Sequence, residues 1–151
     1  MTKTKILNKS RNNSRIFIQN FHPTFRTPLP RNDICSLITK VLQGEDCEIS
    51  HMDVNLLKNK DIRTINNKYL KHNYSTDIIT FQYEREKRKI DGELLISLDK
   101  VKENSKFFRT GYKNEFKRVL IHGCLHLAGY KDDSKKHVEL IRIKENSYLG
   151  I

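Results

Sequence analysis

The sequence is poor in the residues that mark several protein classes. It has no tryptophan, three prolines and six glycines in 151 residues, which excludes a collagen-like or proline-rich chain. It contains no apolar run near the roughly 20 residues of a membrane span. Its basic start lacks the apolar segment of a secretory signal. We therefore expect a cytoplasmic protein with no membrane partner.

Cysteine is scarce as well, and its spacing suggests no pairing. Cys35, Cys47 and Cys124 are odd in number and never occur in a CxxC spacing. This pattern favours reduced, buried thiols over a disulfide framework or a thiolate metal site.

Acidic residues are outnumbered by basic ones. The chain has 29 Lys and Arg against 18 Asp and Glu, a net charge of +11. Such a charge attracts polyanions, of which nucleic acid is the first candidate, although a basic surface can also serve solubility alone. Residues 1–15 carry five basic side chains and no acidic one. We predict a flexible basic tail at 1–15 and one folded domain at 16–151.

Hydrophobic spacing predicts an alternation of strands and helices. Alternating or β-branched runs predict strands at 16–21, 47–56, 78–81 and 93–98. Helical spacing predicts helices at 32–42, 59–70, from a cap at Asp99 onward, 114–128 and 134–146. Asn32 or Asp33 is expected to cap the first helix and Gly44 to end it, and the all-charged segment 84–89 predicts a solvated turn. The predicted fold is one α/β (α+β) domain with a mixed sheet of about four strands and about five helices.

Two histidines four residues apart are the most informative feature. On a helix, His122 and His126 lie about 40° apart on one face, one turn above the other, so both rings can bind one metal ion. Gly129 then ends the helix and reverses the chain, and the carboxylate of Asp132 can approach the same ion. Two histidines and a carboxylate leave positions open for water, as a catalytic zinc site requires. We expect this helix to lie beside a cleft.

Other readings of this segment stay open. An HxxxH spacing alone also arises by chance on helix surfaces and in cores. Cys124 points about 200° away from the histidines around the helix, so it is a poor ligand candidate. His137 lies five residues beyond Asp132 and rivals it for the third position, although we predict that Asp132 binds and His137 does not. Gly123 replaces the glutamate that the H-E-x-x-H peptidases need, which disfavours a peptidase.

The same segment resembles the signature of a known family. Residues 122–130 read HGCLHLAGY and resemble the H-G-x-L-H-L-x-G-Y signature of the YbeY family, the bacterial metal-dependent endoribonucleases of ribosomal RNA maturation. Residues 66–69 and 75–81 look like the family's Asn-x-x-Tyr and Thr-Asp-Val-x-Ser-Phe blocks, and residues 91–97 resemble its Gly-Asp-Ile-x-Ile-Ser strand. The blocks follow in the family's order, and the resemblance covers about residues 16–147.

The resemblance implies a specific activity. It implies a zinc-dependent, single-strand-specific endoribonuclease in the maturation and quality control of small-subunit ribosomal RNA. One Zn²⁺ would be held by His122, His126 and Asp132, with water on the metal as the hydrolytic group. The implied partners are single-stranded RNA and the small ribosomal subunit.

The sequence departs from the family pattern at two positions. Asp132 stands where the family commonly has a third histidine, and Leu70 stands where it usually has an arginine that points at the active site. Lys71 and His72 follow Leu70 and are candidates to take over catalysis or substrate binding, or else an ordinary polar loop. Arg118 is a further candidate for substrate binding.

Several residues near these motifs have two interpretations. Thr76 and Asp77 either line the cleft or fix the entry of a strand. A basic run before the metal helix either grips phosphates or is a solvated helix face: Lys100, Lys102, Lys106, Arg109, Lys113, Lys117 and Arg118. Phe107 and Phe108 are expected in the core rather than as base-stacking groups.

Two further functions compete with the nuclease. The first is a non-catalytic ribosome assembly factor with a mainly structural zinc, which Leu70 in place of arginine favours. The second is a metallohydrolase acting on another substrate, such as a peptide.

Overall fold

The computed structural model describes residues 15–71, 76–86 and 88–151, so most of the predicted basic tail and His72 lie outside the described residues. Four strands and five helices make up the described part. The strands are β1 (Ile16–Asn20), β2 (Glu48–Leu57), β3 (Ile78–Glu86) and β4 (Lys89–Ser97). The helices are α2 (Arg31–Gly44), α3 (Asn59–Leu70), α4 (Leu98–Phe108), α5 (Tyr112–Leu127) and α6 (Lys135–Leu149). The predicted α/β domain is confirmed.

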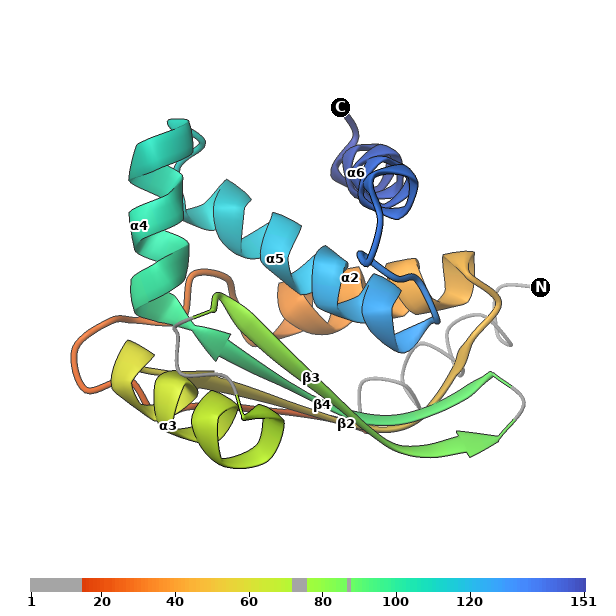
Figure 1. The fold of residues 1–151 in the computed structure, drawn as a ribbon, viewed down its shortest axis with the longest axis horizontal. Coiled ribbons are helices and arrows are strands. Elements are labelled where there is room, and N and C mark those ends of the chain that lie inside the picture. The colour runs from red at the N-terminus through yellow and green to blue at the C-terminus, as the bar shows by residue number, and fades with distance from the viewer. Residues whose placement is uncertain (1–14, 72–75, 87) are drawn as a thin grey trace.

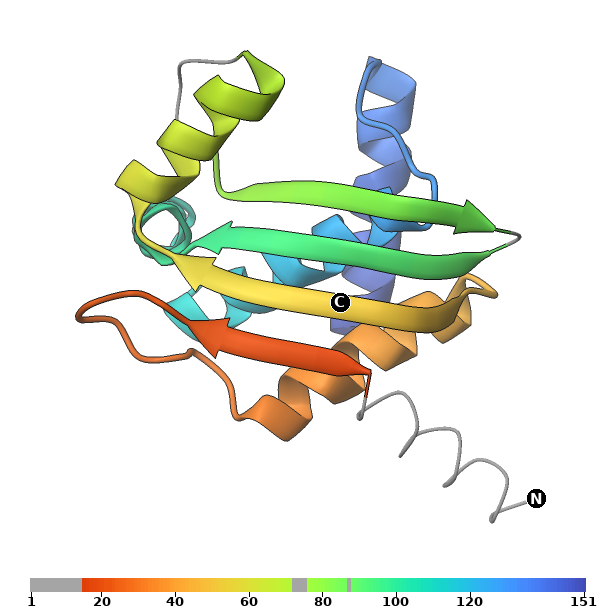
Figure 2. The ribbon, with the colours of Figure 1, turned by 90° about the horizontal axis from the view of Figure 1, so that it is seen from below.

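The strands form one mixed sheet in the order β1-β2-β4-β3. β1 pairs with β2 and β2 with β4 in parallel, whereas β3 and β4 form an antiparallel hairpin. Figure 2 shows the strands side by side, with α2, α5 and α6 behind them and α3 across one end of the near face. α2 forms the crossover between the parallel strands β1 and β2, whereas α3 together with β3 makes up the connection from β2 to its parallel neighbour β4. α2 and α3 lie on opposite faces of the sheet (Figure 2).

The main core lies between the sheet and the layer that contains α2 and α5 (Figure 1). Met52, Val54 and Leu56 alternate along β2 and are fully buried, as expected for one face of a strand. Phe116 and Leu120 of α5 are buried against them in the same cluster. α5, which carries His122 and His126, is therefore the central helix of the core. Its packing there fixes its position and its rotation about its own axis.

A smaller cluster packs on the opposite face under α3. Ile62 of α3 is fully buried with Ile79 and Leu95 of the hairpin. This cluster covers only one end of that face, so Phe17 on β1 and Tyr83 on β3 remain 49% and 61% exposed.

The predicted caps and the predicted turn are corrected by the structure. Pro30 precedes α2, and neither Asn32 nor Asp33 caps it. Ser97 rather than Asp99 caps α4, by accepting the backbone N–H of Lys100 at 3.1 Å. The Asp99 carboxylate instead accepts the backbone N–H of Asn59 at 2.7 Å, a contact between helices that sequence spacing does not reveal. The charged segment 84–89 is not one long turn, because β3 extends to Glu86 and β4 begins at Lys89.

The prediction that Phe107 and Phe108 are core residues is wrong. Their side chains are 81% and 57% exposed, because α4 ends where they lie and no other element covers them. On α6, helical spacing predicts a buried apolar side made of Val138, Ile141 and Ile143. Ile141 is buried, but Val138 and Ile143 are 41% and 66% exposed.

The three cysteines and the five helices all lie in the described part of the chain. Cys35, Cys47 and Cys124 are free and buried. None of the helices there combines the length and apolarity needed to cross a bilayer.

Candidate metal centre

A tight turn after α5 brings the predicted ligands together. The Ala128 and Tyr130 N–H groups donate to the carbonyls of Cys124 and Leu125 at 2.9 and 3.0 Å, which close the last turn of the helix. Gly129 adopts φ 110°, a region that favours glycine, and reverses the chain. Asp132 consequently returns across the end of the helix that carries the histidines.

The three ligand candidates converge on one point. His122 Nε2 and His126 Nε2 are 3.0 Å apart, and Asp132 Oδ2 lies 3.9 and 3.3 Å from them. The three ligand atoms lie within 4.8 Å of one another, so this cluster could hold a metal ion. The histidine side chains are only 24% and 21% exposed, whereas Asp132 is 56% exposed and forms the open side of the site.

Partners behind the rings fix how the histidines present their nitrogens. His126 Nδ1 lies 3.0 Å from the carbonyl oxygen of Tyr130, which can only accept a hydrogen bond. The proton of His126 therefore belongs on Nδ1, and Nε2 keeps its lone pair. His122 Nδ1 lies 3.5 Å from the buried carboxylate of Glu145, which favours the same tautomer.

This arrangement of donors suits a cation. With both ring protons on Nδ1, two Nε2 lone pairs and a carboxylate oxygen face one another, which is repulsive unless a positive ion lies between them. Carbonyl or carboxylate partners behind metal-binding histidines are the usual means of fixing such rings. The donor set of two imidazoles and one carboxylate suits zinc and related divalent transition metals.

Behind the histidines, Arg118 joins two buried glutamates. Its guanidinium donates to both carboxylate oxygens of Glu115, with Nε 3.1 Å from Oε2, and its Nη1 donates to Glu145 at 3.4 Å. Glu115 and Glu145 are only 1% and 5% exposed. The hydrogen bonds that Arg118 donates to Glu115 raise the pKa of Arg118, so its charge is permanent. Arg118 therefore supports Glu145, which lies behind His122, and its predicted role in substrate binding stays a prediction.

A second polar cluster holds the turn from the other side. Glu45, which follows α2, accepts the hydroxyls of Tyr130 and Tyr148, and Lys144 lies 3.5 Å from its carboxylate. Burial raises the pKa of Glu45, but these three partners outweigh it and lower the pKa below 4.5. Because the Tyr130 carbonyl orients His126, we call Glu45, Tyr130, Lys144 and Tyr148 the turn clamp.

The other residues considered for the site do not face the cluster of His122, His126 and Asp132. Cys124 is fully buried, and burial raises the pKa of its thiol to about 12. His137 Nδ1 pairs with the Asp133 carboxylate and lies outside the cluster of potential ligands. A Cβ on Gly123 would overlap Ile78 Cδ1 and lie 3.0 Å from Leu94 Cδ2. Position 123 therefore faces the sheet, where a peptidase-type glutamate could not reach the ion.

A cavity of about 550 Å³ opens beside the cluster. Its wall includes His122 and Asp132 together with residues from the end of α4, from α5 and from α6. Arg118 lines this cavity, whereas Lys71 does not.

Lys71 follows the last residue of α3 and has φ 56°; its side chain is exposed, beside the half-exposed Leu70. The Thr76 hydroxyl donates to the Ile78 carbonyl at 3.4 Å, which is the local strand contact rather than a cleft contact.

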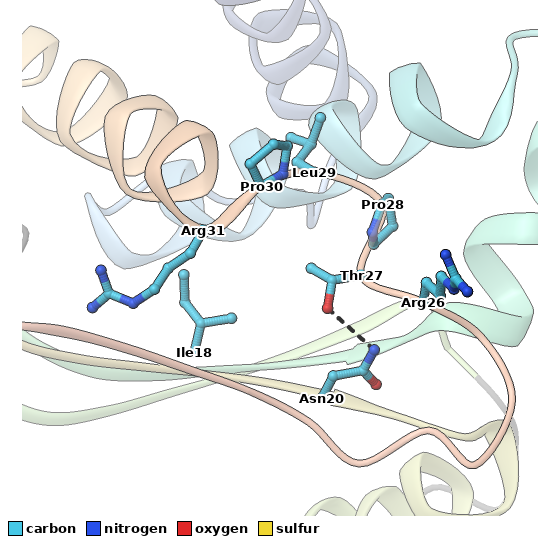
Figure 3. Close-up of a pocket in the computed structure, with 8 residues that line it drawn as sticks. All are labelled: Ile18, Asn20, Arg26, Thr27, Pro28, Leu29, Pro30 and Arg31. Carbon is cyan, nitrogen blue, oxygen red and sulfur yellow. Dashed lines mark hydrogen bonds between the residues drawn. The ribbon is translucent and has the colours of Figure 1, made fainter.

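Figure 3 shows a different cavity, of about 540 Å³, between β1 and the loop that leads into α2. Asn20 Nδ2 donates to Thr27 Oγ1 at 3.2 Å across its wall. Its lining contains no histidine, cysteine or carboxylate side chain, so it offers no set of metal ligands.

Sequence reasoning missed the residues that support the ligands. Glu115 and Arg118 have the i, i+3 spacing of a helical ion pair, a signal that was available. Glu45 and Glu145 come from other helices, and no local pattern connects them to the histidines.

Known proteins resemble this chain over most of its length. The sequence profile of the family described as Endoribonuclease YbeY matches residues 20–150. The Endoribonuclease YbeY of Chlorobium phaeobacteroides is 40% identical over 126 residues, 83% of this chain and 88% of that protein. The one of Cytophaga hutchinsonii is 36% identical over 121 residues, 80% of this chain and 85% of that protein.

A solved structure supports the same relationship. The solution structure of TM1509 from Thermotoga maritima matches with a TM-score of 0.60 and 25% identity, over 89% of each chain. The profile match extends over most of the sequence and includes both histidines and the turn that follows them. This chain belongs to the YbeY family.

Proposed function

We propose that this protein is a zinc-dependent endoribonuclease that cleaves single-stranded RNA during maturation and quality control of small-subunit ribosomal RNA. The observation that carries the proposal is the convergence of His122, His126 and Asp132 in a chain whose relatives are named endoribonucleases. The net charge of +11 suits a polyanionic substrate.

The protein's own residues would prepare the ion for hydrolysis. A divalent ion in this site supplies Lewis-acid chemistry, polarising a phosphate oxygen and lowering the pKa of coordinated water. The Tyr130 carbonyl would hold His126 in the tautomer that leaves Nε2 free, and the nearby Glu145 carboxylate would favour the same tautomer of His122. Asp132 contributes a negative charge that partly neutralises the ion.

The experiment is a cleavage assay on single-stranded RNA with and without a chelator, together with elemental analysis of the purified protein. We expect bound zinc, chelator-sensitive cleavage, and loss of both in His122→Ala. His51→Ala is the matched control, since it removes a histidine of β2 that lies outside the ligand cluster. Chelator-insensitive cleavage, or none by the metal-loaded protein, would contradict the nuclease assignment.

RNA binding should also depend on salt. Each phosphate neutralised by a lysine or arginine releases a counterion, so affinity for single-stranded RNA should fall steeply between low and moderate ionic strength. Filter binding at several salt concentrations measures the slope. An affinity that does not change with salt would argue against phosphate recognition.

One observation favours a second function. Leu70 places an apolar side chain, 42% exposed, at the position where the resemblance to the YbeY family implies an arginine. A ribosome assembly factor with a structural zinc would bind RNA and retain zinc but leave the RNA intact, so the cleavage assay separates the two functions.

A further inference from the structure

One wall of the cavity beside the metal cluster is apolar, and none of the proposed metal ligands forms part of it. Phe108, Val138 and Ile141 contribute this wall, from the end of α4 and from α6. The same cavity reaches His122 and Asp132, so a molecule bound against the apolar wall would share the cavity with two of the proposed metal ligands. Its volume of about 550 Å³ is within the range of small-molecule sites.

Phe108 differs from Phe107 in where its exposed side chain lies. Its side chain lines the cavity, whereas the adjacent Phe107 does not line it and is 81% exposed. The two rings meet edge to face, with centroids 5.0 Å apart and an interplanar angle of 90°. The Phe108 side chain is 57% exposed in spite of this contact, so its ring offers aromatic surface on which a planar base can stack.

Two arginines line this cavity, and they differ in how they are engaged. Arg118 is held by Glu115 and Glu145, as described above. Arg142 is exposed and makes no ion pair or hydrogen bond with any residue in the described ranges. Its five donors are therefore available to an anion, and a guanidinium suits a phosphate in particular.

We propose that this cavity is a nucleotide subsite, in which a base stacks on Phe108 and its phosphate pairs with Arg142. The subsite rests on the proposed nuclease function and extends it, because it would hold the nucleotide that flanks the phosphodiester at the metal cluster. Stacking does not read a particular base, so the subsite accepts any sequence. It requires an unpaired base, which selects single-stranded RNA.

The test measures binding apart from cleavage. A single-stranded RNA with one 2-aminopurine is titrated with the protein in a chelator, and base stacking is followed as quenching of the probe. The chain has no tryptophan to interfere with this signal. The probe is placed in turn at each position of a short oligonucleotide, and the position with the strongest quenching identifies the stacked base.

Paired variants supply the controls. Phe108→Ala should weaken binding about 5- to 150-fold and abolish the strongest quenching, whereas Phe108→Tyr should retain both. Phe107→Ala should bind like wild type. Arg142→Gln should weaken binding about 10-fold or more. Arg63→Gln, which removes the same charge from an exposed position of α3, should change it much less.

The outcomes separate the subsite from the nuclease. Equal losses in Phe107→Ala and Phe108→Ala, equal losses in Arg142→Gln and Arg63→Gln, or no binding by wild type would overturn the subsite. If the variants bind like wild type while chelator-sensitive cleavage is present, the nuclease stands and the subsite is wrong. If wild type quenches the probe through Phe108 but never cleaves, the subsite is supported and the nuclease proposal fails.

Discussion

Removing the charge of Arg118 should destabilise the fold, because two buried glutamates depend on it. Glu115 and Glu145 are 1% and 5% exposed, and Arg118 is the cation that pairs with both. Arg118→Met keeps an unbranched apolar stem and removes the guanidinium. Taking one partner from a buried ion pair typically costs about 3–5 kcal/mol, since the remaining charge is left without compensation.

The expected value lies at the lower end of that range. The Arg118 side chain is 33% exposed, so water screens the network and can partly solvate the abandoned carboxylates. We expect a loss of about 3 kcal/mol in the free energy of unfolding, equivalent to a decrease in Tm of about 6–12 °C for a chain of this size.

Urea denaturation followed by circular dichroism at pH 7 measures the change. Arg142→Met is the matched control, because it removes an exposed arginine from the same cavity and should alter stability by no more than about 0.5 kcal/mol. A loss below about 1 kcal/mol for Arg118→Met would refute the reasoning. If that variant instead stayed stable and lost RNA affinity, Arg118 would be a substrate-binding residue.

Three further outcomes test the site and its packing. Asp132→Ala should lose most of its zinc by elemental analysis whereas His137→Ala should keep it, and full zinc in the first variant would disprove the ligand assignment. Gly123→Ala gains about 1 kcal/mol of helix propensity but overpacks against Ile78 at a cost of about 1–3 kcal/mol. Its Tm should therefore fall, and a rise would contradict the packing. Because the folded-state pKa of Glu45 is lowered, the stability it contributes is complete above pH 4.5 and is lost as the pH falls through the lowered value. Wild type should therefore exceed Glu45→Gln in unfolding free energy at neutral pH and lose that advantage in acid, and a constant difference would be evidence against the turn clamp.

Much of the fold was predictable because the local signals are strong. The helix predicted at 59–70 matches α3, and the helix with the histidines differs from α5 by two residues at its start. The strand face of β2 alternates as sequence spacing requires. These elements bury a regular apolar face, so periodicity alone identifies them.

The errors arise where contacts distant in sequence decide. Asp99 was expected to cap a helix, but its carboxylate binds the Asn59 N–H and pairs with His22. Phe107 and Phe108 are large apolar residues of the kind usually found in a core. They lie at the end of α4, however, where no described element covers them. On α6, spacing suggested a buried apolar face, but only Ile141 and Glu145 are buried and Val138 is 41% exposed.

The candidate site divides in the same way. The ligand positions from 122 to 132 lie within a single helix and turn, so their geometry follows from helical periodicity and one glycine. Glu145 lies behind His122 and Glu45 binds Tyr130, whose carbonyl contacts His126; both glutamates come from elements that only the tertiary fold brings near. Sequence reasoning could therefore propose the ligands but not the groups that orient them.

The turn clamp makes the last turn of α6 a sensitive place for protein handling. Tyr148 lies in that turn, and its hydroxyl binds Glu45. The same helix carries Glu145 behind His122. A truncation that removes this turn, or a purification tag fused directly after the helix, would act within about one helical turn of the Tyr148 contact. Preparations that differ only at this end should therefore be compared for metal content before their activities are compared.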